Sequence, residues 1–106
     1  MKKLFILMSI FSTLFGCCKK SATTYPQDIV TAADGSQITI TFYAHASFGI
    51  AWNDLQLYID PVGEFDWDNQ PKADAILVTH SHYDHLEIAT IERLQKEGTV
   101  ILCDKT

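Results

Sequence analysis

The chain has 106 residues, of which 47% are hydrophobic, and a formal net charge of −5. This composition excludes a disordered chain, and the length leaves room for no more than one small domain. An acidic chain with no basic run is also a poor candidate for binding nucleic acid, because phosphate neutralisation requires Lys and Arg. We therefore expect a small globular protein with no nucleic-acid partner.

The N-terminal residues have the pattern of a secretory signal. Lys2 and Lys3 precede an apolar run at 4–15, which is shorter than the roughly 20 residues that span a bilayer. The sequence LFGC that ends at Cys17 resembles a bacterial lipobox, in which this cysteine carries the lipid. We expect a signal peptide over residues 1–16 and a lipid-anchored protein, with plain secretion or a core helix as alternatives. Because no acidic residue directly follows the cysteine, we expect attachment to the outer membrane of a Gram-negative cell, facing the periplasm.

A polar segment follows the expected anchor. Residues 17–36 are predicted to form the anchor and a tether, since KKSATTYPQD is polar and ADGS is a turn signal. Residues 37–106 are then predicted to contain the folded part. Cys103 lies in an apolar stretch, so we expect it to be a buried hydrophobic residue rather than the disulfide partner of Cys18.

Three strands are predicted next. Apolar and polar residues alternate in QITITFY at 37–43, which is the period of a strand with one buried face. The sequence SFGIAW at 47–52 indicates a second strand, and residues 55–59 indicate a third. Because the links between them are short, we expect an antiparallel meander.

The C-terminal part is predicted to form a strand, a helix and a second strand. The apolar run AILVT at 75–79 and the run TVILC at 99–103 indicate buried strands. Between them, residues 85–98 have apolar side chains at helical spacing and end at a glycine. This order predicts that the two strands are parallel. The acidic 60–74 loop contains two aromatic residues, which either form a pocket wall or pack on the core.

A cluster of histidines follows the first of these apolar runs. Three of the four histidines in the chain, His80, His82 and His85, lie together with Asp84 in THSHYDH. Imidazole and carboxylate groups are ligands for zinc, and also for iron or manganese. Ligands usually bind at the carboxyl ends of parallel strands, where this cluster is predicted to lie. As an alternative for the aspartate, Asp84 and Glu87 have the spacing of a helix capping box.

These residues carry a family resemblance. The sequence THSHYDHL at 79–86 resembles the H-x-H-x-D-H signature of the metallo-β-lactamase superfamily. The sequences YAHASFGI at 43–50 and LYIDPV at 57–62 resemble a branch with ascorbate-6-phosphate lactonase-like and N-acyl-phosphatidylethanolamine phospholipase D-like proteins, although that branch usually has glycine in place of Ala44. The resemblance covers residues 37–104. It implies an α/β fold, the N-terminal half of a four-layer αββα sandwich.

The resemblance also implies an activity and a role for each residue of the cluster. The protein would be a metal-dependent hydrolase of an ester, lactone, amide or phosphoester, with two zinc ions as expected cofactor and manganese or iron as alternatives. His80 and His82 would bind the first ion, and Asp84 and His85 the second. Asp84 would also orient the attacking water and pass its proton to the leaving group.

Two further residues are expected near the ligands. Asp60 ends the third strand and is expected to orient a metal ligand or its loop, with a turn residue before Pro61 as the alternative. His45 is expected to approach the site, with a strand-end histidine bonded to the backbone as the alternative.

The family pattern continues beyond what this chain contains. The second half of the family fold supplies another histidine for each metal and a bridging aspartate, but no histidine follows His85. We therefore expect residues 1–106 to be a truncated form that by itself binds metal weakly and hydrolyses little. The competing hypothesis is a non-enzymatic, degenerate lipid-anchored module that binds metal.

Overall fold

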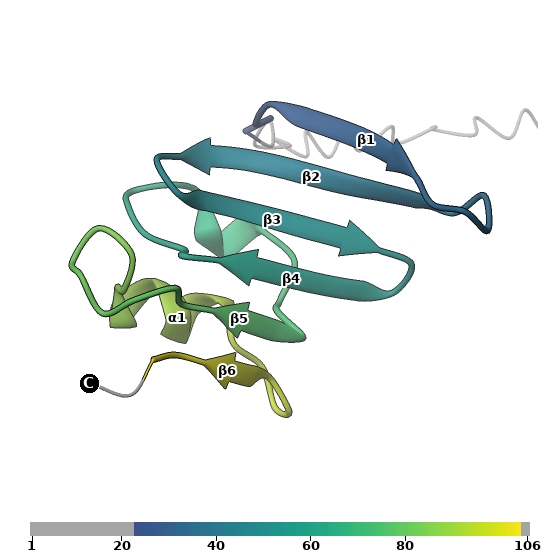
Figure 1. Ribbon diagram of the computed structural model, residues 1–106. Coiled ribbons are helices and arrows are strands. Elements are labelled where there is room, and N and C mark those ends of the chain that lie inside the picture. Colours follow the sequence, from purple (N-terminus) through teal and green to yellow (C-terminus); the bar gives the residue numbers. More distant parts are fainter. Residues whose placement is uncertain (1–22, 105–106) are drawn as a thin grey trace, which may run out of the picture.

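The computed structural model describes residues 23–104, so the expected signal peptide and Cys17 lie outside the described residues. Figure 1 shows a twisted sheet with the helical elements behind it. Along the chain, the strands and helices are β1 (Gln27–Thr31), β2 (Gln37–Ala44), β3 (Ser47–Trp52), β4 (Leu55–Ile59), the 3-10 helix η1 (Trp67–Asn69), β5 (Ala75–Leu77), α1 (Ile88–Leu94) and β6 (Val100–Leu102). None of the helices in residues 23–104 has the length and apolar character needed to span a bilayer.

The predicted meander is confirmed. Strands β2, β3 and β4 are antiparallel neighbours in a sheet whose order follows the sequence from β1 to β6. Ile40 pairs with Ile50, which in turn pairs with Leu57. The alternating apolar residues of the three strands therefore share one face of the sheet, as the period of two requires.

One strand was not predicted. Residues 27–31, which we had assigned to the tether, form β1 and pair antiparallel with β2. Every residue of β1 is exposed. Because neither face of this strand is buried, its sequence does not need to alternate between apolar and polar residues, and it gives no strand signal. Its place is fixed by backbone hydrogen bonds to the edge of β2, a long-range effect that the local pattern does not contain.

The C-terminal strands are parallel, as predicted, because β5 pairs in parallel with both β4 and β6. The expected burial of the last strand is wrong, since all three residues of β6 are exposed. Cys103 is likewise exposed rather than buried, and it forms no disulfide within residues 23–104. The reason is that β6 is the edge strand of the sheet that the structure describes.

Helix α1 begins later than predicted. It spans residues 88–94 instead of 85–98, and Glu87 is its N-cap. The capping-box interpretation of Asp84 is therefore wrong: the residue lies in a turn before the helix, and no side chain caps the first turn. The side chain of Glu87 instead accepts hydrogen bonds from Gly63 N–H and from the hydroxyl of Thr90.

The hydrophobic core lies between the sheet and the helices. Tyr58 and Ile76 of the sheet and Leu94 of α1 are each fully buried, and Trp67 of η1 is only 1% exposed. The aromatic loop residue Trp67 thus packs on the core, as the second of our two interpretations states. Its indole N–H donates to Gly63 O at 2.7 Å, so the one polar group of this side chain has a partner.

The opposite face of the sheet carries the alternating apolar residues of the meander. Within residues 23–104 no helix covers it (Figure 1). Its large side chains that remain exposed are Val30, Phe42, Trp52, Leu55, Val100 and Leu102. The architecture is a mixed sheet with helices on one face, which is the N-terminal part of the predicted α/β sandwich.

Candidate metal centre

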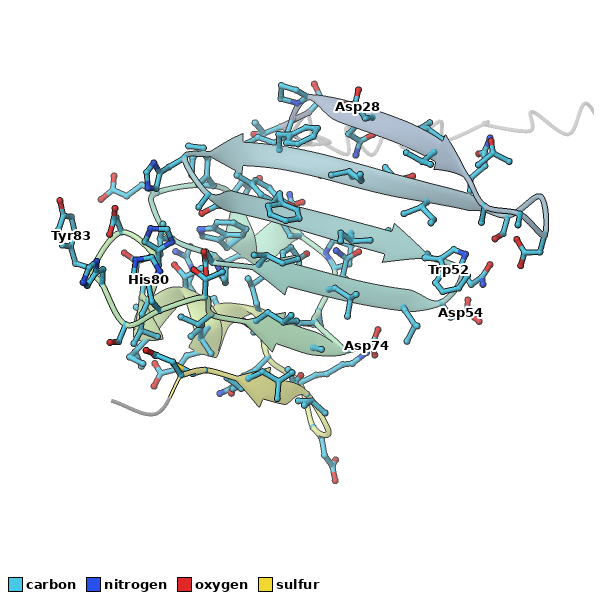
Figure 2. All side chains as sticks on the ribbon, viewed as in Figure 1. Asp28, Trp52, Asp54, Asp74, His80 and Tyr83 are labelled. Carbon is cyan, nitrogen blue, oxygen red and sulfur yellow. The ribbon has the colours of Figure 1, made fainter. Side chains whose placement is uncertain are left out.

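The histidine cluster lies at one end of the strands, where the carboxyl ends of β4 and β5 are next to the turn between β2 and β3 (Figure 2). Strand β5 ends at Leu77, and the segment from Thr79 to Leu86 is a loop with a turn at residues 83–85. The strand predicted over residues 75–79 therefore ends two residues early, and His80 and His82 lie in the loop. The loop is closed by hydrogen bonds from the backbone N–H groups of His85 and Leu86 to His82 O, at 2.9 and 2.8 Å.

Asp60 fixes the start of this loop. Its carboxylate is 1% exposed and accepts hydrogen bonds from the N–H of Thr79 at 2.6 Å and from the Thr79 hydroxyl at 2.7 Å. Its backbone carbonyl accepts a hydrogen bond from the buried hydroxyl of Ser47 at 2.5 Å. The residue adopts a left-handed backbone conformation, with φ of 45°, which is uncommon outside glycine. Asp60 therefore connects the end of β4 to Ser47 of β3 and to Thr79 of the loop.

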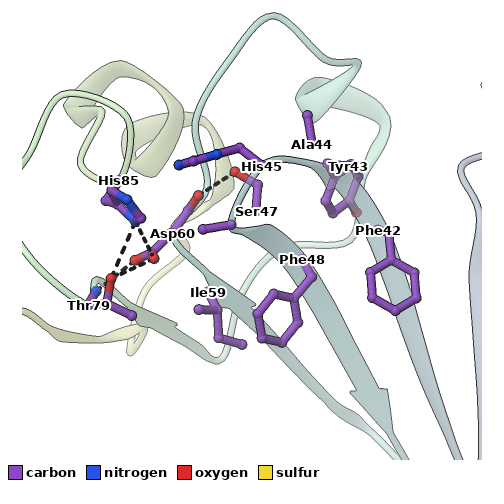
Figure 3. Close-up of a pocket in the computed structure, with 11 residues that line it drawn as sticks. Phe42, Tyr43, Ala44, His45, Ser47, Phe48, Ile59, Asp60, Thr79 and His85 are labelled. Atoms are coloured by element: carbon purple, nitrogen blue, oxygen red, sulfur yellow. Dashed lines mark hydrogen bonds and ion pairs between the residues drawn. The ribbon is translucent and has the colours of Figure 1, made fainter.

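The same carboxylate also contacts a predicted ligand. Oδ2 of Asp60 lies 2.7 Å from Nδ1 of His85, and Figure 3 shows this contact together with the bonds to Thr79. When Nδ1 is held by a carboxylate, Nε2 is the ring nitrogen left to bind a metal, and such a pairing orients the ring. Nε2 of His85 lies 3.6 Å from Oδ2 of Asp84.

His45 enters the cluster from the turn between β2 and β3. Its Nε2 lies 3.2 Å from Oδ2 of Asp84. One ligand atom from each of His45, Asp84 and His85 lies within 4.8 Å of the other two. The structure thus brings one carboxylate and two imidazoles together from segments that are 39 positions apart in the sequence, since 84 minus 45 is 39.

His80 and His82 lie beside this group but are not part of it. The ring centroids of His80 and His85 are 3.9 Å apart, and those of His80 and His82 are 4.6 Å apart. The hydroxyl of Thr79 lies 3.0 Å from Nδ1 of His80. The imidazoles of the signature are therefore contiguous, with His80 between the other two.

The electrostatics keep both carboxylates ionised. Burial raises the pKa of Asp60, but the hydrogen bonds from His85 and Thr79 lower it by more, so the pKa of this carboxyl lies below its usual range. Desolvation also opposes ionisation of Asp84, yet its backbone hydrogen bond and the neighbouring imidazoles hold the pKa of this carboxyl below its ordinary value. The cluster thus contains anionic oxygen and imidazole nitrogen together.

These donors fit a divalent metal. Imidazole nitrogen and carboxylate oxygen are ligands for zinc, manganese and iron. The side chain of Asp84 is 38% exposed and that of His85 is 14% exposed, so an ion and its water can reach both. The buried carboxylate of Asp60 supplies the hydrogen bond that metal-bound histidines usually make through their second nitrogen.

A hollow of about 630 Å³ adjoins the cluster (Figure 3). Its lining includes the apolar residues Phe42, Phe48 and Ile59 as well as His45 and His85. Tyr43 also lines the hollow, but burial raises the pKa of this phenol to about 12. Tyr43 is therefore protonated at neutral pH and is excluded as the base of a reaction there.

Sequence reasoning missed the part that Thr79 takes in the cluster. Its N–H and hydroxyl both donate to Asp60, and the hydroxyl lies within 3.4 Å of Nδ1 of His85. A threonine directly before the first histidine of the signature is a visible signal, but its partner is 19 positions away and no local pattern identifies that partner.

Known proteins are similar to this chain in sequence and in fold. A family model described as the beta-lactamase superfamily domain matches residues 39–104. A crystal structure of a candidate metal-dependent hydrolase from Parabacteroides distasonis ATCC 8503 superposes with a TM-score of 0.70 and 37% sequence identity, over 73% of this chain and 36% of the other.

Two relatives are similar in sequence. The UPF0173 protein PYRAB01190 of Pyrococcus abyssi (strain GE5 / Orsay) is 44% identical over 46 residues, which are 43% of this chain and 22% of the relative. The cytidine monophosphate-N-acetylneuraminic acid hydroxylase of Asterias rubens is 33% identical over 78 residues, and the match covers 58% of this chain and 12% of that protein. The chain thus matches less than a quarter of the length of either relative. Because the family model covers more than half of this chain, the protein belongs to the beta-lactamase superfamily.

Proposed function

We propose that the protein is a metal-dependent hydrolase with a pair of zinc ions as its cofactor. The observation that carries the proposal is the position of His85 between two carboxylates. Asp60 contacts its Nδ1 at 2.7 Å, and Asp84 lies 3.6 Å from its Nε2. This is the arrangement of a metal-binding imidazole with a supporting hydrogen bond. The similarity to a candidate metal-dependent hydrolase supports the same activity.

The proposed ligands divide into two pairs. His80 and His82 would hold one ion, and Asp84 and His85 the other. Zinc in such a site polarises the bond to be cleaved and lowers the pKa of water. Asp84 is ionised, because its pKa lies below the ordinary value, so its carboxylate is ready to accept a proton from the attacking water and deliver it to the leaving group. Asp60 would orient His85 through its contact with Nδ1.

The substrate would bind in the hollow next to these side chains. Phe42 and Phe48 line this hollow together with His45 and His85, and its volume of about 630 Å³ suits a small molecule. The proposed reaction is hydrolysis of an ester, lactone, amide or phosphoester. Within the superfamily, we propose that the protein belongs to the lactonase-like and phospholipase D-like branch. The basis is the resemblance of YAHASFGI at 43–50 and LYIDPV at 57–62 to that branch.

We propose that residues 1–106 by themselves hydrolyse substrate slowly. Each ion would have only two ligands among His80, His82, Asp84 and His85, whereas a catalytic zinc normally has three protein ligands. The competing function is a degenerate module that binds metal without catalysis. The gene sequence downstream of Thr106 distinguishes the two. An in-frame continuation with further His and Asp codons supports the hydrolase, and a stop codon supports the module.

A hydrolysis screen tests the activity. The protein, with any in-frame continuation, is assayed on esters, lactones, amides and phosphodiesters after chelation and again after zinc is restored. We expect turnover only with zinc, and a loss of at least about 100-fold in Asp84→Asn, which lacks the proton acceptor. Tyr83→Ala is the matched control, because this side chain is 91% exposed in the same loop. Full zinc binding without turnover on any substrate would favour the module.

We also propose that the protein is anchored to the outer membrane through a lipid on Cys17, facing the periplasm. Support for this location comes from the lipobox-like sequence alone. Metabolic labelling with a fatty acid should label the wild-type protein and not Cys17→Ser. Membrane association of Cys17→Ser equal to that of the wild type would contradict the anchor.

A further inference from the structure

The hydroxyl of Thr79 lies between a buried carboxylate and a histidine. Its Oγ1 is 2.7 Å from Oδ2 of Asp60 and 3.0 Å from Nδ1 of His80. The side chain of Asp60 is only 1% exposed, so its oxygens depend on hydrogen-bond donors of the protein rather than on water. The hydroxyl of Thr79 is one of these donors, and it is also in contact with an imidazole.

The single hydrogen of this hydroxyl decides the direction of both bonds. A hydroxyl has one O–H to donate and two lone pairs that accept, whereas a carboxylate only accepts. Two oxygen atoms 2.7 Å apart need that hydrogen between them, so the hydroxyl of Thr79 donates to Asp60. Only lone pairs of Oγ1 are then left for His80. The contact of 3.0 Å is therefore a hydrogen bond in which Nδ1–H of His80 donates.

This direction determines the tautomer of His80. A neutral imidazole has one N–H, and the other ring nitrogen carries the lone pair. With the hydrogen on Nδ1, Nε2 of His80 is the atom free to bind a metal ion. His85 is in the same state, because its Nδ1 lies 2.7 Å from the carboxylate of Asp60. The two rings are neighbours, with centroids 3.9 Å apart.

We propose that Thr79 is a positioning residue whose hydroxyl connects Asp60 to His80. The carboxylate would then fix the tautomers of two histidines, that of His85 directly and that of His80 through the hydroxyl. The tautomers follow from contacts among the described residues. Their consequence for metal binding rests on the proposed function, which assigns His80 to one ion and His85 to the other. Thr79 would thus link the two ion sites.

The test observes the tautomers by NMR in metal-free protein. The full chain, isotope-labelled at its histidine nitrogens, is measured in chelator at alkaline pH, where free imidazole is neutral. A ring nitrogen that carries hydrogen and one that carries a lone pair differ widely in chemical shift. Thr79→Val removes the hydroxyl at similar size, and Thr79→Ser keeps it. Thr41→Val is the matched control, because the hydroxyl of Thr41 is bonded to Gln27 outside the cluster.

We expect Nδ1–H at His80 in the wild type, in Thr79→Ser and in Thr41→Val. In Thr79→Val, the hydrogen of His80 should move to Nε2, while His85 keeps Nδ1–H because Asp60 contacts it directly. The amide spectrum verifies that each variant is folded. In the protein with any in-frame continuation, Thr79→Val should also weaken zinc binding by about 10–100-fold, the usual loss for a group that orients a ligand.

Three outcomes would overturn the inference. The first is a wild-type His80 whose hydrogen is on Nε2 or is shared between both nitrogens, a measurement that depends on no variant. The second is an unchanged tautomer of His80 in folded Thr79→Val. The third is a change at His85 in that variant, which would give Thr79 a general structural role. The expected tautomers in a protein that binds no zinc would support the inference and contradict the proposed function.

Discussion

The two ends of the sheet reverse the chain with different residues. At the end away from the cluster, the positions with positive φ are Gly35, Asn53 and Gly98, which are residues that turn chemistry favours. At the cluster end they include His45 and Asp60. The side chain of His45 contacts Asp84, and that of Asp60 contacts His85. Local propensity therefore explains one end of the sheet, and the contacts of the cluster explain the other.

The first prediction tests the core that both ends share. Trp67→Ala should lower the free energy of unfolding by about 3–5 kcal/mol, since the side chain is 1% exposed in the main cluster of buried residues. Chemical denaturation measures the loss. A variant with wild-type stability and altered substrate affinity would contradict this. Trp67 would then belong to the pocket wall and not to a core that supports both ends of the sheet.

The second prediction concerns the cluster end. Asp60→Ala removes a buried carboxylate that accepts hydrogen bonds from the N–H and the hydroxyl of Thr79, which should cost about 1–3 kcal/mol in the free energy of unfolding. It also removes the partner of Nδ1 of His85, so zinc affinity should fall about 10–100-fold. Asp60→Asn, which keeps one acceptor, should lose less stability. Equal zinc affinity in all three proteins would show that Asp60 does not support the site.

The third prediction concerns the opposite end. Gly98 has a φ of 85° and open space where a Cβ atom would stand, so Gly98→Ala introduces backbone strain without a clash. The expected loss is about 1–2 kcal/mol in the free energy of unfolding. Zinc affinity should stay at the wild-type value. If zinc affinity falls together with stability, the two ends are coupled and the comparison fails.

The smallest effect is expected at Asn53. Because asparagine tolerates positive φ and glycine adopts it freely, Asn53→Gly should change the free energy of unfolding by less than about 0.5 kcal/mol. A loss above 1 kcal/mol would mean that this turn has a role that its conformation does not explain.

The contrast between local sequence patterns and long-range contacts also explains which parts of the structure the sequence predicts. The meander follows from alternating residues such as Ile38 and Ile40, and the histidine cluster is visible because its members are close in sequence. Strand β1 was missed because its residues are all exposed. The early helix start was wrong because Glu87, not Asp84, is the N-cap; the turn of the cluster takes up the residues in between.

Long-range contacts account for the rest of the site. The pair of Asp60 and His85 is separated by 25 positions and that of Asp60 and Thr79 by 19. The approach of His45 to Asp84 depends on a turn conformation that its residue type does not favour. These contacts exist because β4 and β5 are parallel neighbours and end at one edge, which is a property of the folded sheet and not of any short stretch of sequence.

The central claim is that the loop from Thr79 to Leu86 is a metal centre. Crystals of the protein grown with zinc, measured at the zinc absorption edge, locate the ion by its anomalous signal. The account predicts a peak about 2.0–2.2 Å from Asp84 and His85, with Asp60 still bonded to Nδ1 of His85. An intact fold with saturating zinc and no peak among these side chains would contradict it.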